Sequence, residues 1–151
     1  MLFTREFREF VELLNSNKVE YLVVGAFAVA WHGHPRFTGD LDIWIRPDAE
    51  NAGHLLDALQ QFGFGSLDIN IEDLATAGQI IQLGIQPNRI DLITSISGVA
   101  FEEAWDGRIE GSIDDVPVNF IGRTALIQNK ESTGRAKDRG DAEELRKRQP
   151  K

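Results

Sequence analysis

The segment from residue 40 to residue 45 alternates polar and apolar side chains with a period of two. Its residues are, in order, Asp40, Leu41, Asp42, Ile43, Trp44 and Ile45. This period is that of a β-strand, because successive side chains of a strand point to opposite faces of the sheet. The segment is therefore predicted to be a strand with two different faces, one entering the core and the other carrying both carboxylates.

The rest of the chain carries the patterns of one domain that mixes helices and strands. Apolar runs predict further strands at residues 21–24, 80–83, 89–94 and 116–121. Amphipathic spacing and capping residues predict helices at residues 3–14, 26–32, 48–62, 99–105, from 124 onwards and around 143–145. We expect a single α/β domain spanning residues 1–151, with a short basic helical segment at about 124–151.

Length and composition exclude several classes of protein. With 151 residues, of which 42% are hydrophobic and 26% charged, the chain has the composition of one ordinary folded domain. It contains no cysteine, which excludes disulfide scaffolds, thiolate zinc sites and cysteine nucleophiles. We expect a cytoplasmic protein with no membrane partner, because neither a signal peptide nor a stretch of about 18 apolar residues is present.

The charge is unevenly distributed along the chain. The net charge of −8 disfavours extensive non-specific binding to nucleic acid. Residues 121–151, however, hold nine Lys or Arg against five Asp or Glu. This basic segment is either a solvated terminal helix, which is the usual case for such a pattern, or a cationic patch beside the carboxylates.

The carboxylates of Asp40 and Asp42 suggest a metal site. On a strand, residues two apart share a face and their Cα atoms lie about 6.5–7 Å apart. Asp91 supplies a third carboxylate, within the strand predicted at residues 89–94. If the two strands are neighbours, the three carboxylates can hold Mg²⁺ (or Mn²⁺), which prefers oxygen ligands. An isolated Asp-x-Asp is more often a solvated strand face.

Gly25 and Ala26 lie between a predicted buried strand and a predicted helix. A glycine there lets the backbone approach a ligand closely, and the free N–H groups of a helix start attract phosphate. The simpler interpretation is that the glycine only ends the strand. The phosphate-binding interpretation gains weight because the carboxylates of Asp40, Asp42 and Asp91 follow in the chain.

These motifs, in this order, resemble the nucleotidyltransferase superfamily with a DNA polymerase beta-like catalytic core. The fuller string over residues 25–42 is similar to a bacterial branch near the antibiotic adenylyltransferases and the nucleotidyltransferase-like toxins of toxin–antitoxin and phage-defence systems. Members of that branch tend to end in a Lys-containing helix followed by Gly-Arg-x-Lys-Asp, here Lys130 and residues 134–138. The resemblance covers roughly residues 20–145.

The resemblance implies a fold, a reaction and a set of site residues. The fold would be a mixed β-sheet flanked by helices. The enzyme would move a nucleoside monophosphate from an NTP to an acceptor hydroxyl and release pyrophosphate. Asp40, Asp42 and Asp91 would be catalytic and would hold Mg²⁺ (or Mn²⁺), and Asp91 would also assist deprotonation of the acceptor. Gly25 and the N–H of Ala26 would face the nucleotide phosphates.

Basic and polar residues outside the carboxylate motifs are further candidates for phosphate binding. Arg36 and Thr38 would contact phosphate or orient the first carboxylate, unless they merely neutralise the acidic cluster. Lys130 is the preferred cation for the triphosphate or the leaving pyrophosphate. Arg135 and Lys137 would either assist it or belong to a solvated helix face.

The sequence does not identify the acceptor or the protein partners. The acceptor could be a protein side chain, a tRNA end or a small molecule. The family usually has Gly or Ser where this chain has Ala26, and many relatives carry a helical acceptor domain that is not seen here. Both departures favour an alternative, a catalytically inactive nucleotidyltransferase-like binding module, for example one member of a toxin–antitoxin or phage-defence pair with a partner encoded nearby. A metal-dependent phosphohydrolase is a third interpretation, and Trp44 is a candidate base or acceptor contact.

Overall fold

The computed structural model describes residues 3–34, 39–65, 68–85 and 87–148, so Arg36 and Thr38 lie outside the described residues. The strands are β1 (Tyr21–Val24), β2 (Leu41–Ile45), β3 (Ile80–Leu83), β4 (Ile90–Ile93), β5 (Ile109–Ile113) and β6 (Val116–Phe120). The helices are α1 (Arg5–Ser16), α2 (Gly25–Trp31), α3 (Ala49–Leu59), α4 (Ile71–Ala75), α5 (Phe101–Asp106), α6 (Arg123–Ser132) and α7 (Ala136–Lys147), with a short π-helical turn, η1 (Gln60–Phe64), after α3.

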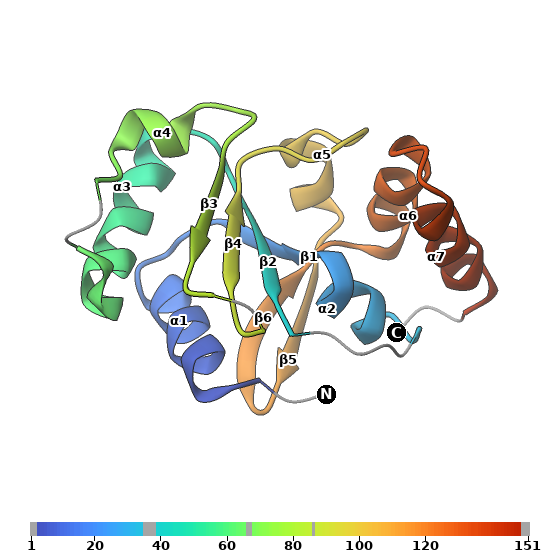
Figure 1. The fold of residues 1–151 in the computed structure, drawn as a ribbon, viewed down its shortest axis with the longest axis horizontal. Coiled ribbons are helices and arrows are strands. Elements are labelled where there is room, and N and C mark those ends of the chain that lie inside the picture. The colour runs from blue at the N-terminus through green and yellow to red at the C-terminus, as the bar shows by residue number, and fades with distance from the viewer. Residues whose placement is uncertain (1–2, 35–38, 66–67, 86, 149–151) are drawn as a thin grey trace.

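The strands form one mixed sheet in the order β3-β4-β2-β1-β6-β5 (Figure 1). The central strand β2 runs antiparallel to β1 and parallel to β4. β1 in turn runs parallel to β6, and the outer strands β3 and β5 are antiparallel to their neighbours. The expectation of a mixed sheet flanked by helices is confirmed.

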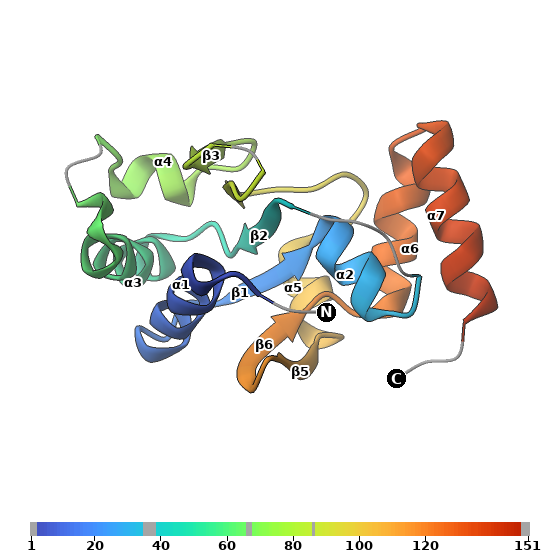
Figure 2. The ribbon, with the colours of Figure 1, turned by 60° about the horizontal axis from the view of Figure 1, so that its bottom comes forward.

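Two hydrophobic clusters cover the two faces of the sheet. The buried residues of α1 and α3 pack with Leu41, Ile43 and Ile45 of β2. Buried residues of α2, α5, α6 and α7 form the second cluster, which includes Trp44 of β2. Both views of the ribbon show α6 and α7 side by side, at the end of the molecule opposite α3 and α4 (Figures 1 and 2). β2 therefore has apolar contacts on both faces, and within the strand only Asp42 is not fully buried.

Local sequence signals explain most of the element boundaries. Thr4 caps α1, because its Oγ1 accepts a hydrogen bond of 3.1 Å from the backbone N–H of Phe7. The predicted cap of α6 is wrong: Gly122, and not Thr124, is its N-cap. The short elements α4 and β5 are absent from the predictions. None of the helices formed by the described residues is long and apolar enough to span a membrane.

Candidate active site

Strand pairing brings two of the predicted carboxylates together. In the parallel register of β2 and β4, Asp42 lies directly opposite Asp91. The prediction that the carboxylates converge required these two strands to be neighbours, and they are. On its other side Asp42 pairs with Val24, the last residue of β1. The acidic pair consequently lies where β1 ends and where β2 and β4 begin.

Gly25 borders this pair and leaves no room for a side chain. Its φ is +66°, and a Cβ built on it would lie 2.2 Å from Oδ2 of Asp42. A larger residue would be strained by the left-handed backbone and would collide with the carboxylate. Ala26 follows in the first turn of α2 and lines the same cleft as Gly25 and Asp42. Glycine is thus required here by tertiary contact as well as by the turn.

The environment of Asp42 opposes its ionisation. Burial, together with the nearby charge of Asp91, a hydrogen bond with the Asp91 carboxyl and the charge of Asp40, raises the pKa of Asp42 from 3.8 to about 6. Adjacent oxygen donors that repel one another are suited to a divalent cation such as Mg²⁺ or Mn²⁺. Because the two carboxylates are adjacent and Asp42 lines the cleft, Asp42 and Asp91 fit a divalent ion.

Asp40 is held apart from this pair by Arg89. The Oδ1 of Asp40 accepts the backbone N–H of Arg89 at 3.0 Å, and its Oδ2 lies 3.6 Å from Nη2 of the same residue. The guanidinium also donates to Asp91, from Nε to Oδ1 at 2.6 Å and from Nη2 to Oδ2 at 3.1 Å. In the described part of the chain no three acidic or histidine side chains are placed to share a metal ion. The three-carboxylate metal site therefore remains a prediction.

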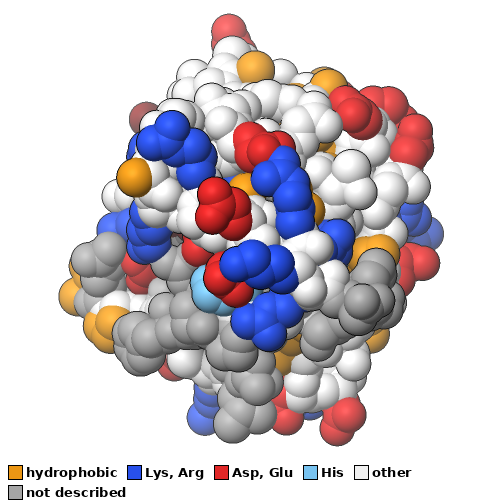
Figure 3. Space-filling view, turned by 90° about the vertical axis from the view of Figure 1, so that its right-hand side faces the viewer, with side chains coloured by type: hydrophobic (Ala, Val, Ile, Leu, Met, Phe, Trp, Pro, Cys, Tyr) orange, Lys and Arg blue, Asp and Glu red, His pale blue; other side chains and the backbone are white. Residues whose placement is uncertain are grey.

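Lys130 and the start of α7 form the opposite wall of a cleft of about 260 Å³ over this site. The cleft is lined by Gly25, Asp42, Lys130 and Arg135, and its continuation reaches Ala26 and Lys137. The face of α6 and α7 carries Lys or Arg side chains closely mixed with Asp or Glu (Figure 3). The cleft thus has a carboxylate on the strand side, and its helix side carries Lys130, Arg135 and Lys137 together with Asp138.

Buried carboxylates of α7 fix the position of Lys130. Its Nζ lies 3.2 Å from Oδ1 of Asp138 and 3.6 Å from Oδ2 of Asp141, and both acidic side chains are 7% exposed. Although burial opposes it, hydrogen bonds from Thr133 and Lys130, together with the charge of Lys130, lower the pKa of Asp138. The sequence gave no sign of the role of Asp141. The contact between these buried carboxylates and Lys130 depends on tertiary packing, so no local sequence pattern shows it.

The predicted site residues can now be placed. Gly25, Ala26, Asp42 and Lys130 line one cleft, Asp91 adjoins Asp42, and Asp40 is linked to Asp91 through a guanidinium. Arg89 was missed as a functional residue. It could have been found by parity, because a residue two positions before Asp91 on a strand lies on the same face.

Trp44 does not have the role suggested for it. It lies on the face of Asp42 by parity, as expected, but its side chain is buried and packs edge-on against Phe101 with ring centroids 5.0 Å apart. The hydrophobic cluster under α5 takes the ring because α5 crosses this face of the sheet. A base or acceptor contact by Trp44 is therefore wrong.

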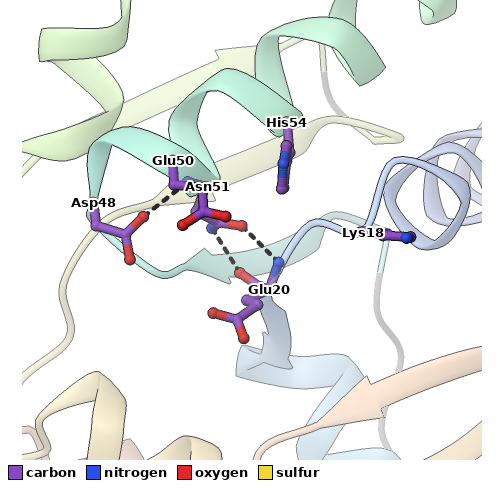
Figure 4. Close-up of a pocket in the computed structure, with 6 residues that line it drawn as sticks. All are labelled: Lys18, Glu20, Asp48, Glu50, Asn51 and His54. Carbon is purple, nitrogen blue, oxygen red and sulfur yellow. Dashed lines mark hydrogen bonds between the residues drawn. The ribbon is translucent and has the colours of Figure 1, made fainter.

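A second pocket lies at the other end of β1 and β2. It is lined by Lys18, Glu20, Asp48, Glu50, Asn51 and His54 (Figure 4). Asn51 projects from α3 toward the residue before β1, accepting from the N–H of Glu20 at 2.7 Å and donating to its carbonyl at 3.0 Å (Figure 4). These bonds satisfy backbone groups at a strand end. We assign this pocket a structural role.

The raised pKa of Asp42 predicts how the metal-free protein responds to pH. Between pH 3.8 and about 6 the folded chain binds more protons at Asp42 than the unfolded chain does. The contribution of Asp42 to stability therefore falls as pH rises through this window, by up to about 3 kcal/mol. In urea unfolding with a chelator present, Asp42→Asn should be more stable than wild type at pH 7, and this advantage should vanish near pH 4. An equal advantage at both pH values would mean that ionisation is not its cause.

Comparisons with known proteins bear on the fold. A scan against family models and a search of curated proteins find no match. Solved structures do match this chain, among them nucleotidyltransferases and an antibiotic-resistance factor. A Thermotoga maritima protein assigned as a nucleotidyltransferase has a TM-score of 0.63 and 20% identity over 95% of this chain and 89% of its own.

Two antibiotic-resistance proteins are similar as well. The lincosamide antibiotic adenylyltransferase LnuA, solved with lincomycin bound, has a TM-score of 0.60 and 16% identity over 97% of this chain and 98% of its own. The antibiotic-resistance factor ANT(2″)-Ia has a TM-score of 0.55 and 15% identity over 93% of this chain and 80% of its own. The chain therefore has the fold of these nucleotidyltransferases, as the resemblance of its glycine and carboxylate motifs implied.

Proposed function

We propose that the protein is a metal-dependent nucleotidyltransferase, which transfers a nucleoside monophosphate from an NTP to an acceptor hydroxyl and releases pyrophosphate. One observation carries the proposal. Asp42 and Asp91 lie side by side on parallel strands, and the missing Cβ of Gly25 leaves the space that the Asp42 carboxylate occupies. The fold shared with nucleotidyltransferases supports it.

Each wall of the cleft has its own task in this reaction. Divalent ions bound by Asp42, Asp91 and Asp40 would neutralise charge on the attacking and leaving oxygens. Lys130, with Arg135 and Lys137 beside it, binds the triphosphate and stabilises the departing pyrophosphate. The backbone of Gly25 and Ala26 approaches the phosphates, while Asp91 accepts the proton of the acceptor hydroxyl as that oxygen attacks the α-phosphorus.

Among possible acceptors, a small hydroxylated molecule is favoured. LnuA matches this chain over 97% of one and 98% of the other, and it was solved with lincomycin bound. LnuA therefore binds lincomycin with a chain of about this extent. We accordingly propose a small molecule ahead of a protein side chain or a tRNA end.

The first test is thermal unfolding with Mg²⁺ alone and with Mg²⁺ plus each of the four NTPs. A ligand at about 100 times its Kd adds about 2.7 kcal/mol to stability. For a domain of this size that corresponds to a rise in Tm of roughly 5–10 °C. We expect such a rise with at least one NTP in the wild type and its loss in Asp42→Asn.

A matched control distinguishes the site from charge in general. Asp57 is an exposed carboxylate on α3, which covers the opposite face of the sheet, so Asp57→Asn should keep the full shift. If folded wild type shows no shift with any NTP, the enzymatic proposal fails and the binding-module alternative takes its place. Once binding is established, the reaction products are analysed. Pyrophosphate together with a nucleotidylated acceptor identifies transfer, whereas free phosphate or NMP alone identifies hydrolysis.

A further inference from the structure

Arg89 contacts two of the carboxylates that the proposed function needs. Its Nε and Nη2 form a two-pronged interaction with Asp91, at 2.6 and 3.1 Å. The same Nη2 lies 3.6 Å from Oδ2 of Asp40. The guanidinium therefore lies between the two carboxylates and binds both.

The backbone holds Arg89 in this position. Its carbonyl accepts the N–H of Leu41 at 2.9 Å, and its own N–H donates to Oδ1 of Asp40 at 3.0 Å. These bonds tie the residue before β4 to the start of β2. Because Arg89 and Asp91 lie two positions apart, their side chains emerge on the same face. The contact is thus built into the strand pairing.

The ion pairs are also partly shielded from water. The side chain of Arg89 is 22% exposed, and those of Asp40 and Asp91 are 23% and 12% exposed. The hydrogen bonds to Asp91 raise the pKa of Arg89, which stays charged at every working pH. Two-pronged, charge-assisted pairs of this kind are stronger than exposed surface pairs.

Lys130 is engaged elsewhere. Its Nζ is held by Asp138 and Asp141 of α7, on the opposite wall of the cleft. The two cations therefore serve different groups: Lys130 faces the cleft from the helices, while Arg89 binds the strand carboxylates directly.

We propose that Arg89 is an internal counter-cation that competes with divalent metal ions for Asp91 and Asp40. Binding of an ion at the carboxylate cluster then requires the guanidinium to leave Asp91. In the absence of metal, Arg89 stabilises the fold by neutralising a cluster of three carboxylates. The proposal deepens the proposed function, on whose carboxylates it rests, and it concerns ion binding alone, with no nucleotide present.

The test compares the affinity of wild type and Arg89→Gln for Mn²⁺ alone by calorimetry. Removing a fixed positive charge from beside the site removes its repulsion of the ion. We expect Arg89→Gln to bind Mn²⁺ at least about tenfold more tightly than wild type. Without metal the variant should have a lower Tm, and Mn²⁺ should raise that Tm by more than it raises the Tm of wild type.

Arg46 supplies the matched control. It follows the other end of β2, where its guanidinium pairs with Glu20 and Glu102, and its side chain is 16% exposed. Arg46→Gln removes a comparable paired guanidinium away from the site, so it should leave the Mn²⁺ affinity unchanged. An increase in affinity equal to that of Arg89→Gln would show a general effect of charge and would overturn the proposal.

Arg89→Lys keeps the test decisive if Arg89→Gln does not fold. Lysine retains the charge but cannot form the two-pronged contact. It should therefore bind Mn²⁺ more tightly than wild type and less tightly than Arg89→Gln. The same Kd in wild type as in the folded Arg89 variants, or no binding by any of them, overturns the proposal. Failure of the proposed function is seen separately, as the absence of an NTP-dependent shift in wild type.

Discussion

Asp91→Asn should reduce the rate of nucleotidyl transfer by about a thousandfold or more, which corresponds to about 4 kcal/mol of lost transition-state stabilisation. Asparagine has nearly the same shape, and its Oδ1 can still accept from Nε of Arg89, so the fold should persist. The amide has no negative charge with which to hold a divalent ion and is a very weak base. Both tasks proposed for Asp91 are therefore lost together.

The measurement is pyrophosphate release in single turnover, with the NTP identified by thermal shift and a panel of small hydroxylated acceptors. Asp57→Asn, on the opposite face of the sheet, should keep the wild-type rate. Circular dichroism must show that Asp91→Asn is folded. A folded Asp91→Asn variant that retained more than about a tenth of wild-type kcat would remove Asp91 from the catalytic role.

Gly25→Ala should destabilise the protein by about 2–5 kcal/mol and abolish the NTP-dependent rise in Tm. An alanine at φ +66° is strained by about 1–2 kcal/mol. Its Cβ would also lie 2.2 Å from Oδ2, 3.0 Å from Cγ and 3.1 Å from Cβ of Asp42. Because the Cβ of Asp42 is among the crowded atoms, turning the carboxylate does not relieve the whole clash, and overpacking adds about 1–3 kcal/mol. Asp42 must therefore leave its present position beside Gly25.

Gly84→Ala separates backbone strain from the clash. Gly84 has φ +83°, and nothing lies within 4 Å of the Cβ built on it. Its replacement should cost only about 1 kcal/mol, because strain is partly offset by a less flexible unfolded chain. Urea unfolding measures both variants. Equal losses of stability at the two positions would mean that contact with Asp42 does not make Gly25 necessary.

The sequence predicted the local elements that carry the site. Alternation over residues 40–45 predicted β2, and the apolar run before Gly25 predicted β1. Such patterns are informative because burial of one strand face, or of both, dictates the order of side chains. The sequence did not predict β5, whose residues Ile109–Ile113 include Glu110, Gly111 and Ser112 at an outer position of the sheet. The five-residue helix α4 was missed because so short a segment shows little periodicity.

The candidate site shows the same difference between what the local sequence predicted and what tertiary packing decided. Residue types, spacing and the family resemblance pointed to Gly25, Asp42 and Asp91, and the structure brings these three residues together. Long-range packing decided that Trp44 is buried under α5 and that Lys130 lies between two carboxylates of α7. Neither arrangement has a local pattern, since each depends on how distant helices cross the sheet.

By itself, then, the sequence determined a mixed α/β chain with a glycine turn and carboxylates at the starts of two strands. Only the tertiary structure decided that Asp42 faces Asp91 directly, while Asp40 is reached through Arg89. The physical reason is strand register: a shift of one residue between β2 and β4 would turn one carboxylate to the opposite face. That register is set by the burial of Leu41, Ile43, Ile90 and Leu92 against α1 and α3, which lie far away in the chain.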